Sequence, residues 1–408
     1  MTAALHLSSI THRYPGAARP TLDAVHLEVG EGEMIAVLGP SGSGKTTLLR
    51  VAAGLDRPES GDVRLDGASV LDVPTERRDV TVMFHKPHLF PHLSVIDNVA
   101  FADRLRGMSR RDSRAVAQRY LELVHLADMG QRRPRQLSGG QEQRVALARA
   151  LAASRRVMLL DEPFSALDTG LRTSMHDLLG EVRAALDPTI VMVTHDLDEA
   201  GLAERVAVLV DGRIEQFDTI QTLYTEPRTL AVARLVGGFN EIPGHIRSRV
   251  HRSALGTVGL PAASERVAGE GAAVLLVRKE RLRLVDAERG SAIPGRVVAV
   301  RQSGLRQDVV VQLASEPTAR ATRIEVEAPL GVTVRPGDRT GVMLPAPDGV
   351  WAVAEEQRGG SSRSLQEAAM PSAPGDTFGN VAMLADENPD PAGRQRPGER
   401  FWALRWVP

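Results

Sequence analysis

Cysteine is absent from all 408 positions of this sequence. Disulfide scaffolds, thiolate metal sites and cysteine nucleophiles are therefore excluded. Aromatic residues make up only 3% of the chain, and 50 basic residues against 51 acidic residues leave a net charge of −1. The chain as a whole therefore lacks the strong basic field that favours nucleic acid or anionic lipid, although a local patch remains compatible with this balance.

Long apolar runs and lysines are also scarce. No stretch approaches the roughly 18 consecutive apolar residues that a membrane-spanning helix needs. Residues 1–13 lack the apolar segment of a signal peptide, so we expect a cytoplasmic protein. Among the 50 basic residues only Lys45, Lys86 and Lys279 are lysines, which makes each a candidate for chemistry that arginine does not perform.

The first part of the chain, residues 1–238, alternates short apolar runs with helical stretches. This alternation predicts an α/β fold with buried, largely parallel strands. An amphipathic, arginine-rich helix is expected within 110–130, as part of a helical subdomain at about 86–150. The predicted strands are 34–38, 80–84, 157–160, 190–193 and 206–210.

The sequence pattern changes after residue 238, which predicts a second domain. Residues 239–356 hold short strands at 273–277, 296–300 and 308–313, separated by Pro-Gly and Asp-Gly turns. This pattern indicates a small all-β, barrel-like domain. Residues 357–408 are rich in Gly, Pro, Ser and Arg, so we expect a disordered low-complexity tail. Trp402 and Trp406 near its end leave a docking segment as the alternative.

A glycine-rich loop follows the predicted strand 34–38 and precedes a helical stretch, and it matches the phosphate-loop pattern G-x-x-x-x-G-K-[ST]. Glycines let backbone N–H groups face a phosphate, and the helix N-terminus adds partial positive charge. Lys45 would reach the β- and γ-phosphates, and the Thr46 hydroxyl would bind Mg²⁺. The alternative is a glycine-rich turn without a ligand. The predicted nucleotide-binding residues are Gly39, Pro40, Ser41, Gly42, Ser43, Gly44, Lys45, Thr46 and Thr47.

Two carboxylates end the buried strand that begins at Val157. Asp161 is expected to hold Mg²⁺, usually through a water, and Glu162 to orient or deprotonate an attacking water. Paired acids after a strand can also cap a helix. A phosphate loop in the same chain favours the catalytic interpretation.

A short polar motif, Leu137-Ser-Gly-Gly-Gln141, precedes a strong helix. Alone it could be a serine helix cap. Together with the phosphate loop and the Leu-Leu-Asp-Glu-Pro strand end, in this order, it closely resembles the ATP-binding subunits of ABC transporters. The resemblance covers about residues 5–240 and implies an ABC ATPase of the α/β P-loop NTPase fold, which binds ATP and Mg²⁺.

The resemblance assigns further residues to the site. Tyr14 matches the aromatic residue that stacks on adenine, and Asp168 matches the loop that lines the dimer interface. His195 matches the switch histidine that holds the γ-phosphate and the attacking water. Without the resemblance these would be a core tyrosine, a turn residue and a structural histidine. The motif Ser138, Gly139, Gly140 and Gln141 matches the signature that contacts the γ-phosphate bound by a second subunit.

One position departs from the family pattern. The family usually has Gln after the strand at 80–84, where it touches Mg²⁺ and links the site to the membrane subunits, whereas this sequence has His85. Mg²⁺ prefers oxygen ligands, so a neutral imidazole is a poor direct replacement, although it could act through a water. Either the substitution is tolerated with slower turnover, or it alters coupling and pH dependence.

The second domain resembles the OB-like regulatory domain of bacterial importer ATPases, carried by residues 277–284, 295–300 and 336–344. The segment 237–244 looks like the junction in importers of polyamines, ferric iron or phosphonates. The chain is therefore expected to energise solute import, as a homodimer or with a paralogous ATPase. A transmembrane permease and an extracytoplasmic solute-binding protein are the expected partners, at the inner face of the cell membrane.

Two rival functions remain. A soluble ABC ATPase acting on ribosomes or DNA would carry two cassettes or a long coiled coil, and neither is present in this sequence. An exporter ATPase would lack the C-terminal domain. OB-folds can bind oligonucleotides, but the low aromatic content and near-zero net charge argue against nucleic acid as a partner.

Overall fold

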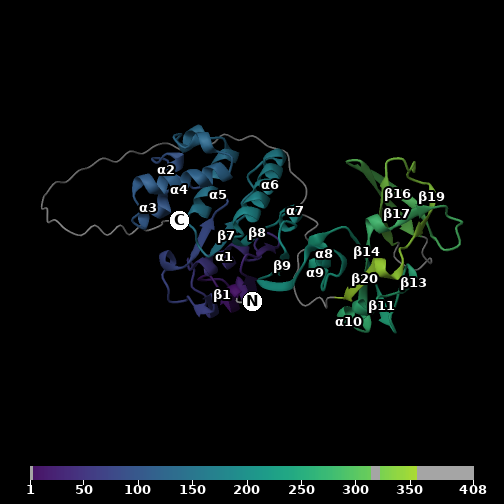
Figure 1. Cartoon of the computed structure of the whole chain (residues 1–408). Helices are drawn as coiled ribbons and strands as arrows, with labels where there is room; N and C mark the ends of the chain where they lie inside the picture. The colour runs from purple at the N-terminus through teal and green to yellow at the C-terminus, as the bar shows by residue number, and fades with distance from the viewer. Residues whose placement is uncertain (1–2, 314–321, 356–408) are drawn as a thin grey trace, which may run out of the picture. The chain divides into compact units, whose positions relative to one another are not determined.

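Four β-sheets organise the part of the chain that the structure, a computed structural model, describes: residues 3–313 and 322–355 (Figure 1). These residues belong to one unit, Met1–Glu356. The predicted tail at 357–408, with Trp402 and Trp406, lies outside the described residues. The helices of this part lack the combination of length and hydropathy that a membrane span requires.

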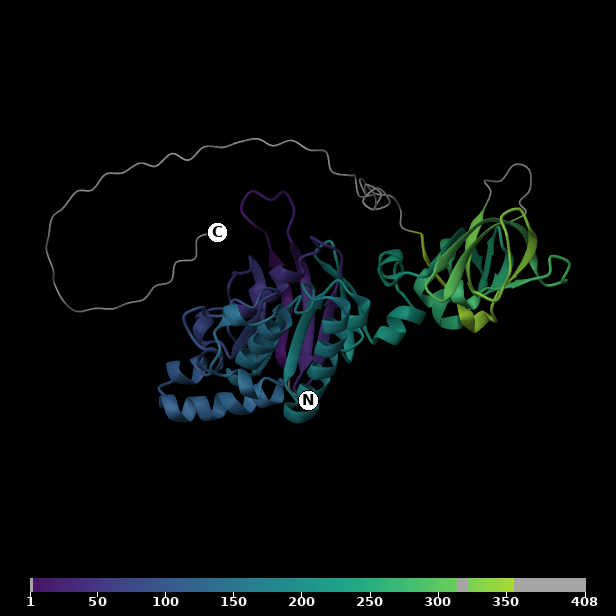
Figure 2. The same ribbon diagram turned by 90° about the horizontal axis from the view of Figure 1, so that it is seen from above.

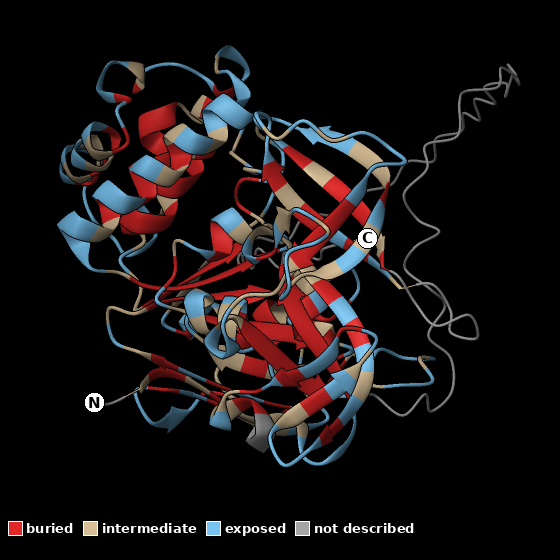
Figure 3. Ribbon diagram, turned by 90° about the vertical axis from the view of Figure 1, so that its right-hand side faces the viewer, coloured by how far each residue is buried: buried red, intermediate tan, exposed pale blue. Residues whose placement is uncertain are grey.

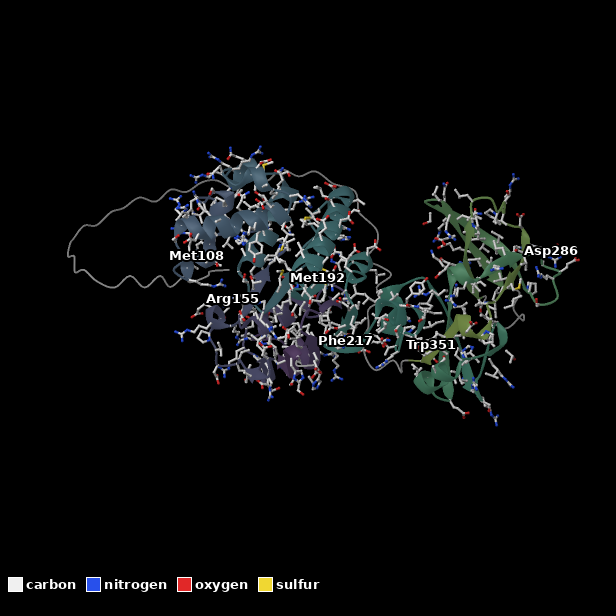
Figure 4. All side chains as sticks on the ribbon, viewed as in Figure 1. Met108, Arg155, Met192, Phe217, Asp286 and Trp351 are labelled. Carbon is white, nitrogen blue, oxygen red and sulfur yellow. The ribbon has the colours of Figure 1, made fainter. Side chains whose placement is uncertain are left out.

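The largest sheet has the strand order β10-β9-β3-β8-β7-β6, in which all neighbours except β10 and β9 run parallel. Its central strands are buried along their whole length, because apolar clusters cover both faces (Figure 3). Met192 in β8 is an example (Figure 4). This confirms the predicted α/β fold. The strands are β3 (Met34–Leu38), β6 (Val80–Met83), β7 (Val157–Asp161), β8 (Thr189–Thr194), β9 (Arg205–Val210) and β10 (Arg213–Asp218).

A second, antiparallel sheet near the N-terminus was not predicted from the sequence. Its order is β2-β1-β4-β5, and α1 packs against it and the parallel sheet through one apolar cluster that includes Leu5, Leu48 and Val191. The strands are β1 (Ala3–His12), β2 (Leu22–Gly30), β4 (Ser60–Leu65) and β5 (Ala68–Ser69).

The helices α2 to α5 form a group of their own, visible in both Figure 1 and Figure 2. Within it, α4 packs on α2 and α5, and its buried face includes Ala117 and Leu121. The predicted amphipathic helix is therefore present, although it ends at Leu123 rather than at residue 130. The helices of the first part are α1 (Lys45–Ala53), α2 (Val95–Val99), α3 (Phe101–Leu105), α4 (Arg110–Leu123), α5 (Gly139–Ala152), α6 (Thr169–Leu186), α7 (Leu197–Ala200), α8 (Ile220–Thr225) and α9 (Leu230–Val236).

The second part is almost entirely β, as predicted. Its two antiparallel sheets share one apolar cluster, to which Ile242 and Leu275 contribute from one sheet and Val309 and Val326 from the other. The first sheet contains β11 (Phe239–Arg247), β12 (Val250–Ser253), β13 (Gly256–Gly259), β14 (Gly271–Arg278) and β20 (Val350–Ala354), next to α10 (Ala262–Ala268). The second contains β15 (Arg283–Val285), β16 (Ile293–Ser303), β17 (Arg306–Leu313), β18 (Arg323–Pro329) and β19 (Arg339–Met343).

A small apolar cluster joins α9 to β14 and β20. Leu230 of α9 packs there with Leu276 and with Trp351, which Figure 4 labels. The Trp351 Nε1–H donates to the Pro227 carbonyl at 2.8 Å. The segment between α8 and α9 also contacts the first part, because Gln216 of β10 is hydrogen-bonded to the backbone at residues 226 and 228. The predicted boundary at 238 therefore falls within a shared packing contact.

Candidate active site

The loop between β3 and α1 has a backbone that tolerates only glycine at two positions. At Gly39, a Cβ atom would lie 2.2 Å from the Leu209 carbonyl oxygen of β9. At Gly44, φ is 105° and a Cβ would lie 2.6 Å from the Thr21 carbonyl oxygen. α1 begins directly afterwards at Lys45. A helix N-terminus behind such a loop favours phosphate, because its free N–H groups carry partial positive charge.

The Lys45 side chain is almost fully buried and is held by the loop itself. Its Nζ donates to the carbonyl oxygens of Gly39 at 2.9 Å and Pro40 at 3.0 Å. Burial lowers the pKa of Lys45, and the charges of Glu162 and Asp161 oppose this effect. The loop therefore contains a fixed cation within electrostatic range of both predicted carboxylates.

The two predicted Mg²⁺ ligands are in contact. The Thr46 Oγ1 hydroxyl donates to Asp161 Oδ1 at 3.1 Å. Burial raises the pKa of the Asp161 carboxyl, and Glu162 adds to this effect, whereas the Thr46 hydrogen bond and the charge of His85 oppose it. His85 is exposed just after β6. The loop, the end of β7 and the end of β6 therefore meet at one place.

Glu162 and His195 come together at the ends of the neighbouring strands β7 and β8. His195 Nδ1 lies 3.4 Å from Glu162 Oε2, and both side chains are partly exposed. Glu162 has φ of 45°, an unusual value for a residue other than glycine, and its N–H donates to the Val193 carbonyl at 3.0 Å. Such backbone conformations concentrate at functional sites. The geometry leaves a carboxylate and an imidazole open to solvent beside the phosphate loop.

The signature motif forms the N-terminus of α5. Ser138 caps the helix by accepting from the Gln141 N–H at 3.4 Å, and Gln141 Oε1 accepts from the Ser138 N–H at 3.0 Å. Gly140 is buried, and a Cβ there would lie 3.0 Å from Leu171 of α6. Ser138 and Gly139 are exposed. Within the described residues, no hydrogen bond or ion pair links this motif to residues 39–47 of the same chain.

The predicted interface loop lies between Glu162 and α6. Asp168 caps α6 by accepting from the Leu171 N–H at 3.0 Å. The Ser165 hydroxyl donates to the Glu162 carbonyl at 3.0 Å. The loop is therefore anchored at one end to the backbone of Glu162 and at the other end to α6.

Tyr14 is 39% exposed rather than part of the core. Its hydroxyl donates to Asp56 Oδ2 at 3.0 Å and lies 3.2 Å from the Thr47 Oγ1 atom of α1. The ring stands edge-on to His12. These contacts hold the tyrosine beside the phosphate-loop helix while one part of the ring remains open.

Sequence reasoning missed one ion pair next to the site. Arg172 of α6 donates to Asp196 Oδ2 at 3.0 Å, and Asp196 directly follows His195. The sequence gives only one indication of this pair, namely that Arg172 comes four residues after Asp168.

The buried Ser43 hydroxyl has no hydrogen-bond partner within the described residues. It therefore leaves one polar group of the phosphate loop available.

Comparisons with known proteins agree with this geometry. Residues 22–165 match the family model described as ABC transporter. The chain is 38% identical over 331 residues to the Spermidine/putrescine import ATP-binding protein PotA of Lawsonia intracellularis, covering 79% of this chain and 90% of that protein. It is 42% identical over 326 residues to the Sulfate/thiosulfate import ATP-binding protein CysA of Bradyrhizobium diazoefficiens, covering 79% and 92%.

A solved structure shares the fold of the first part. It is cbiO1 from Clostridium perfringens, part of the ABC transporter complex cbiONQ, at 26% identity and a TM-score of 0.52. The alignment covers 55% of this chain and 92% of that chain. The family predicted from the phosphate loop, the acidic strand end and the signature is thus confirmed, and the chain belongs to the ATP-hydrolysing, ATP-binding subunits of bacterial ABC importers.

Proposed function

We propose that the chain binds MgATP at Tyr14 and residues 39–47, and hydrolyses it with Glu162 and His195 to drive import through a separate permease. The observation that carries the proposal is the meeting of the phosphate loop with the ends of β6, β7 and β8. A buried cation, two oxygen ligands and an exposed Glu–His pair gather there. These are the groups that phosphoryl transfer to water requires.

The Thr46–Asp161 pair fits Mg²⁺, because hydroxyl and carboxylate oxygens are the hard ligands that this ion prefers. When bound, Mg²⁺ would neutralise charge on the phosphate oxygens. An imidazole nitrogen is a weaker partner for a hard cation. We therefore assign the direct protein contact to Thr46, and contacts through water to Asp161 and His85.

Each remaining side chain has one task in this proposal. Lys45 binds the β- and γ-phosphate oxygens through its ammonium group. Glu162 orients the attacking water and accepts its proton, which its partly exposed carboxylate allows. His195, 3.4 Å from Glu162, donates to the γ-phosphate and keeps the water in line. Tyr14 stacks on the adenine ring.

The signature acts on the ATP of a second subunit. Ser138 and Gly139 are exposed at the N-terminus of α5, a 14-residue helix whose partial positive charge suits a γ-phosphate. Two copies of this chain, or this chain and a paralogue, would enclose two ATP molecules. The loop with Asp168 would line their interface. ATP then acts as a ligand that favours the closed dimer, and hydrolysis releases it.

The transport partners follow from this role. We propose that the chain sits at the inner face of the cell membrane, bound to a permease that receives solute from an extracytoplasmic binding protein. The two relatives named above are import subunits for spermidine/putrescine and for sulfate/thiosulfate. A polyamine or another small ion, such as ferric iron or a phosphonate, is the proposed solute. The β-rich second part would be the OB-like regulatory domain.

The first experiment measures ATP hydrolysis by the purified full chain with and without Mg²⁺. Glu162→Gln should lower kcat by about 100-fold or more, because the general base is lost, while ATP still brings two chains together on gel filtration. Glu181→Gln is the matched control, since Glu181 also pairs with a histidine, His125, at 2.8 Å, but on the exposed side of α6. Equal rates for Glu162→Gln and the parent chain would remove Glu162 as the base.

The second experiment addresses the solute. Uptake of labelled putrescine, sulfate and ferric iron is compared in source cells with the gene intact, deleted, or replaced by the Glu162→Gln form. Loss of one uptake activity in both altered strains identifies the solute class. Unchanged uptake of all three would refute putrescine and ferric iron as solutes, and copurified permease and binding proteins would then supply new candidates to test.

A further inference from the structure

Arg172 lies in the first turn of α6 and contacts both functional segments beside it. Its Nη1 donates to Asp196 Oδ2 at 3.0 Å, and its Nη2 donates to the Leu167 carbonyl at 3.4 Å. Leu167 directly precedes Asp168 of the interface loop, and Asp196 directly follows His195. One guanidinium therefore bridges the loop proposed to sense the second subunit and the residue proposed to hold the γ-phosphate.

Asp196 fixes the backbone on the C-terminal side of His195. Its carboxylate caps α7 by accepting from the N–H groups of Asp198 at 2.8 Å and Glu199 at 3.3 Å, and its own N–H donates to Thr194 Oγ1 at 3.0 Å. A displacement of Asp196 would therefore turn the adjoining His195 as well. A misplacement of about 1 Å at a reacting group can lower the rate ~100-fold.

The contacts close into a ring around the site. From His195 the ring continues to Glu162 at 3.4 Å, and from the Glu162 carbonyl to Ser165 at 3.0 Å. Ser165 leads along the interface loop to Leu167, where Arg172 returns the ring to Asp196. The Arg172 Nε atom has no partner within the described residues. The guanidinium is therefore held through its Nη1 and Nη2 atoms, which donate to Asp196 and Leu167.

We propose that Arg172 is a positioning residue that sets the orientation of His195 according to the position of the interface loop. The proposal rests on the catalytic roles given above to Glu162 and His195. Movement of the loop at Asp168 on dimer closure would pass through the guanidinium to Asp196 and then to His195. Hydrolysis would thereby depend on dimer closure in two ways: through the signature motif of the second subunit, and through the orientation of His195.

The side chains of Arg172 and Asp196 are 32% and 25% exposed. Ion pairs this open to solvent contribute little to global stability. The expected effect of breaking the pair is therefore on the rate of hydrolysis, with little effect on folding. If the pair were purely structural, breaking it would change the melting temperature and dimer formation instead of the rate of hydrolysis. This difference makes the proposal testable.

The test compares Arg172→Gln, Asp196→Asn and the double variant in the full chain. Asn retains an acceptor for the cap of α7, so Asp196→Asn removes the charge while α7 remains capped. Each single variant should lower kcat by ~10-fold or more with KM for ATP unchanged, as expected for an interaction that matters at the reacting geometry. The kcat of the double variant should be no lower than the kcat of the more impaired single variant, because the pair acts as one unit.

Arg183→Gln is the matched control, because Arg183 also lies on α6 and pairs with Glu204 and the Leu202 carbonyl, away from the site. It should retain the parent kcat. A second readout is ATP-dependent dimer formation in the Glu162→Gln background, which Arg172→Gln should leave unchanged.

Two results would overturn the proposal: an unchanged kcat in Arg172→Gln and Asp196→Asn, or a lower kcat accompanied by weaker ATP binding or dimer formation. Should Arg172→Gln fold poorly, Asp196→Asn alone decides between these outcomes. Failure of the proposed function is distinguishable, since Glu162→Gln would then hydrolyse ATP at the parent rate whatever Arg172 does.

Discussion

Asp97 of α2 is the best point at which to test the electrostatics of the helical group. Its carboxylate is almost fully buried and accepts from Arg114 of α4 at 2.8 and 2.7 Å and from the Ser94 hydroxyl at 2.8 Å. The hydrogen bonds to Arg114 contribute most to lowering the pKa of Asp97, from its ordinary value of 3.8 to about 2. This shift corresponds to about 2 kcal/mol of stability at neutral pH.

The perturbation is Asp97→Asn, which removes the charge at nearly constant volume. The variant should lose about 2 kcal/mol, so that amides of α2 and α4 exchange with solvent ~30-fold faster at pH 7. Because folding lowers the pKa, the contribution is complete above pH 4 and falls as the pH approaches 2. About half of the difference between parent and variant should therefore be lost by pH ~3.

Hydrogen exchange of peptides from α2 and α4, corrected for the intrinsic exchange rate at each pH, is the assay. Asp112→Asn is the matched control, since Asp112 also accepts from a serine three residues earlier, Ser109, but without an arginine partner. Equal exchange in the two variants would refute the account of the Arg114 pair.

Three further predictions concern the site and the junction. His85→Gln should preserve or raise Mg²⁺-dependent ATPase activity, because an amide oxygen replaces a nitrogen near a hard cation; a large loss of activity would give His85 a role of its own. Gly44→Ala should weaken ATP binding in calorimetry by more than ~10-fold, since φ of 105° and the Thr21 carbonyl at 2.6 Å exclude a Cβ. Trp351→Phe should lower stability in thermal unfolding by about 1 kcal/mol, because the Pro227 carbonyl loses its 2.8 Å donor; an unchanged melting temperature would contradict this.

The parallel sheet could be predicted from the sequence because burial on both faces produces continuous apolar runs. The run at 34–38 became β3 with the same ends, and 80–84 became β6 (Val80–Met83). The antiparallel sheet was missed for a physical reason. Bulges in β1 shift its register, and Ser9 adopts φ of 47°, so the two-residue alternation that marks a half-buried strand is interrupted.

Candidate site residues could be proposed from the sequence where the chemistry depends on local spacing. The phosphate loop, the carboxylates after β7 and the signature each occupy a few consecutive residues, so a short motif is sufficient. The link from Arg172 to Asp196 spans 24 positions and exists only because α6 returns beside the end of β8. The Asp97–Arg114 pair likewise depends on how α2 packs on α4. Periodicity and motifs contain no information on such pairings.

The packing of α9 against β14 and β20 determines how this chain can be divided. A protein ended at residue 238 would retain Leu230 and Ala233 but lose Leu276 and Trp351, which cover them. That face would then be exposed apolar surface, a common cause of aggregation. A cut after β10, at residue 218, would keep this small cluster intact, but it would remove Leu223, Val232 and Val236 from the main apolar cluster of the first part, together with the two hydrogen bonds of Gln216. α9 therefore packs against both parts of the chain, and an exchange of the second part between relatives has to preserve the apolar contacts on both faces of this helix.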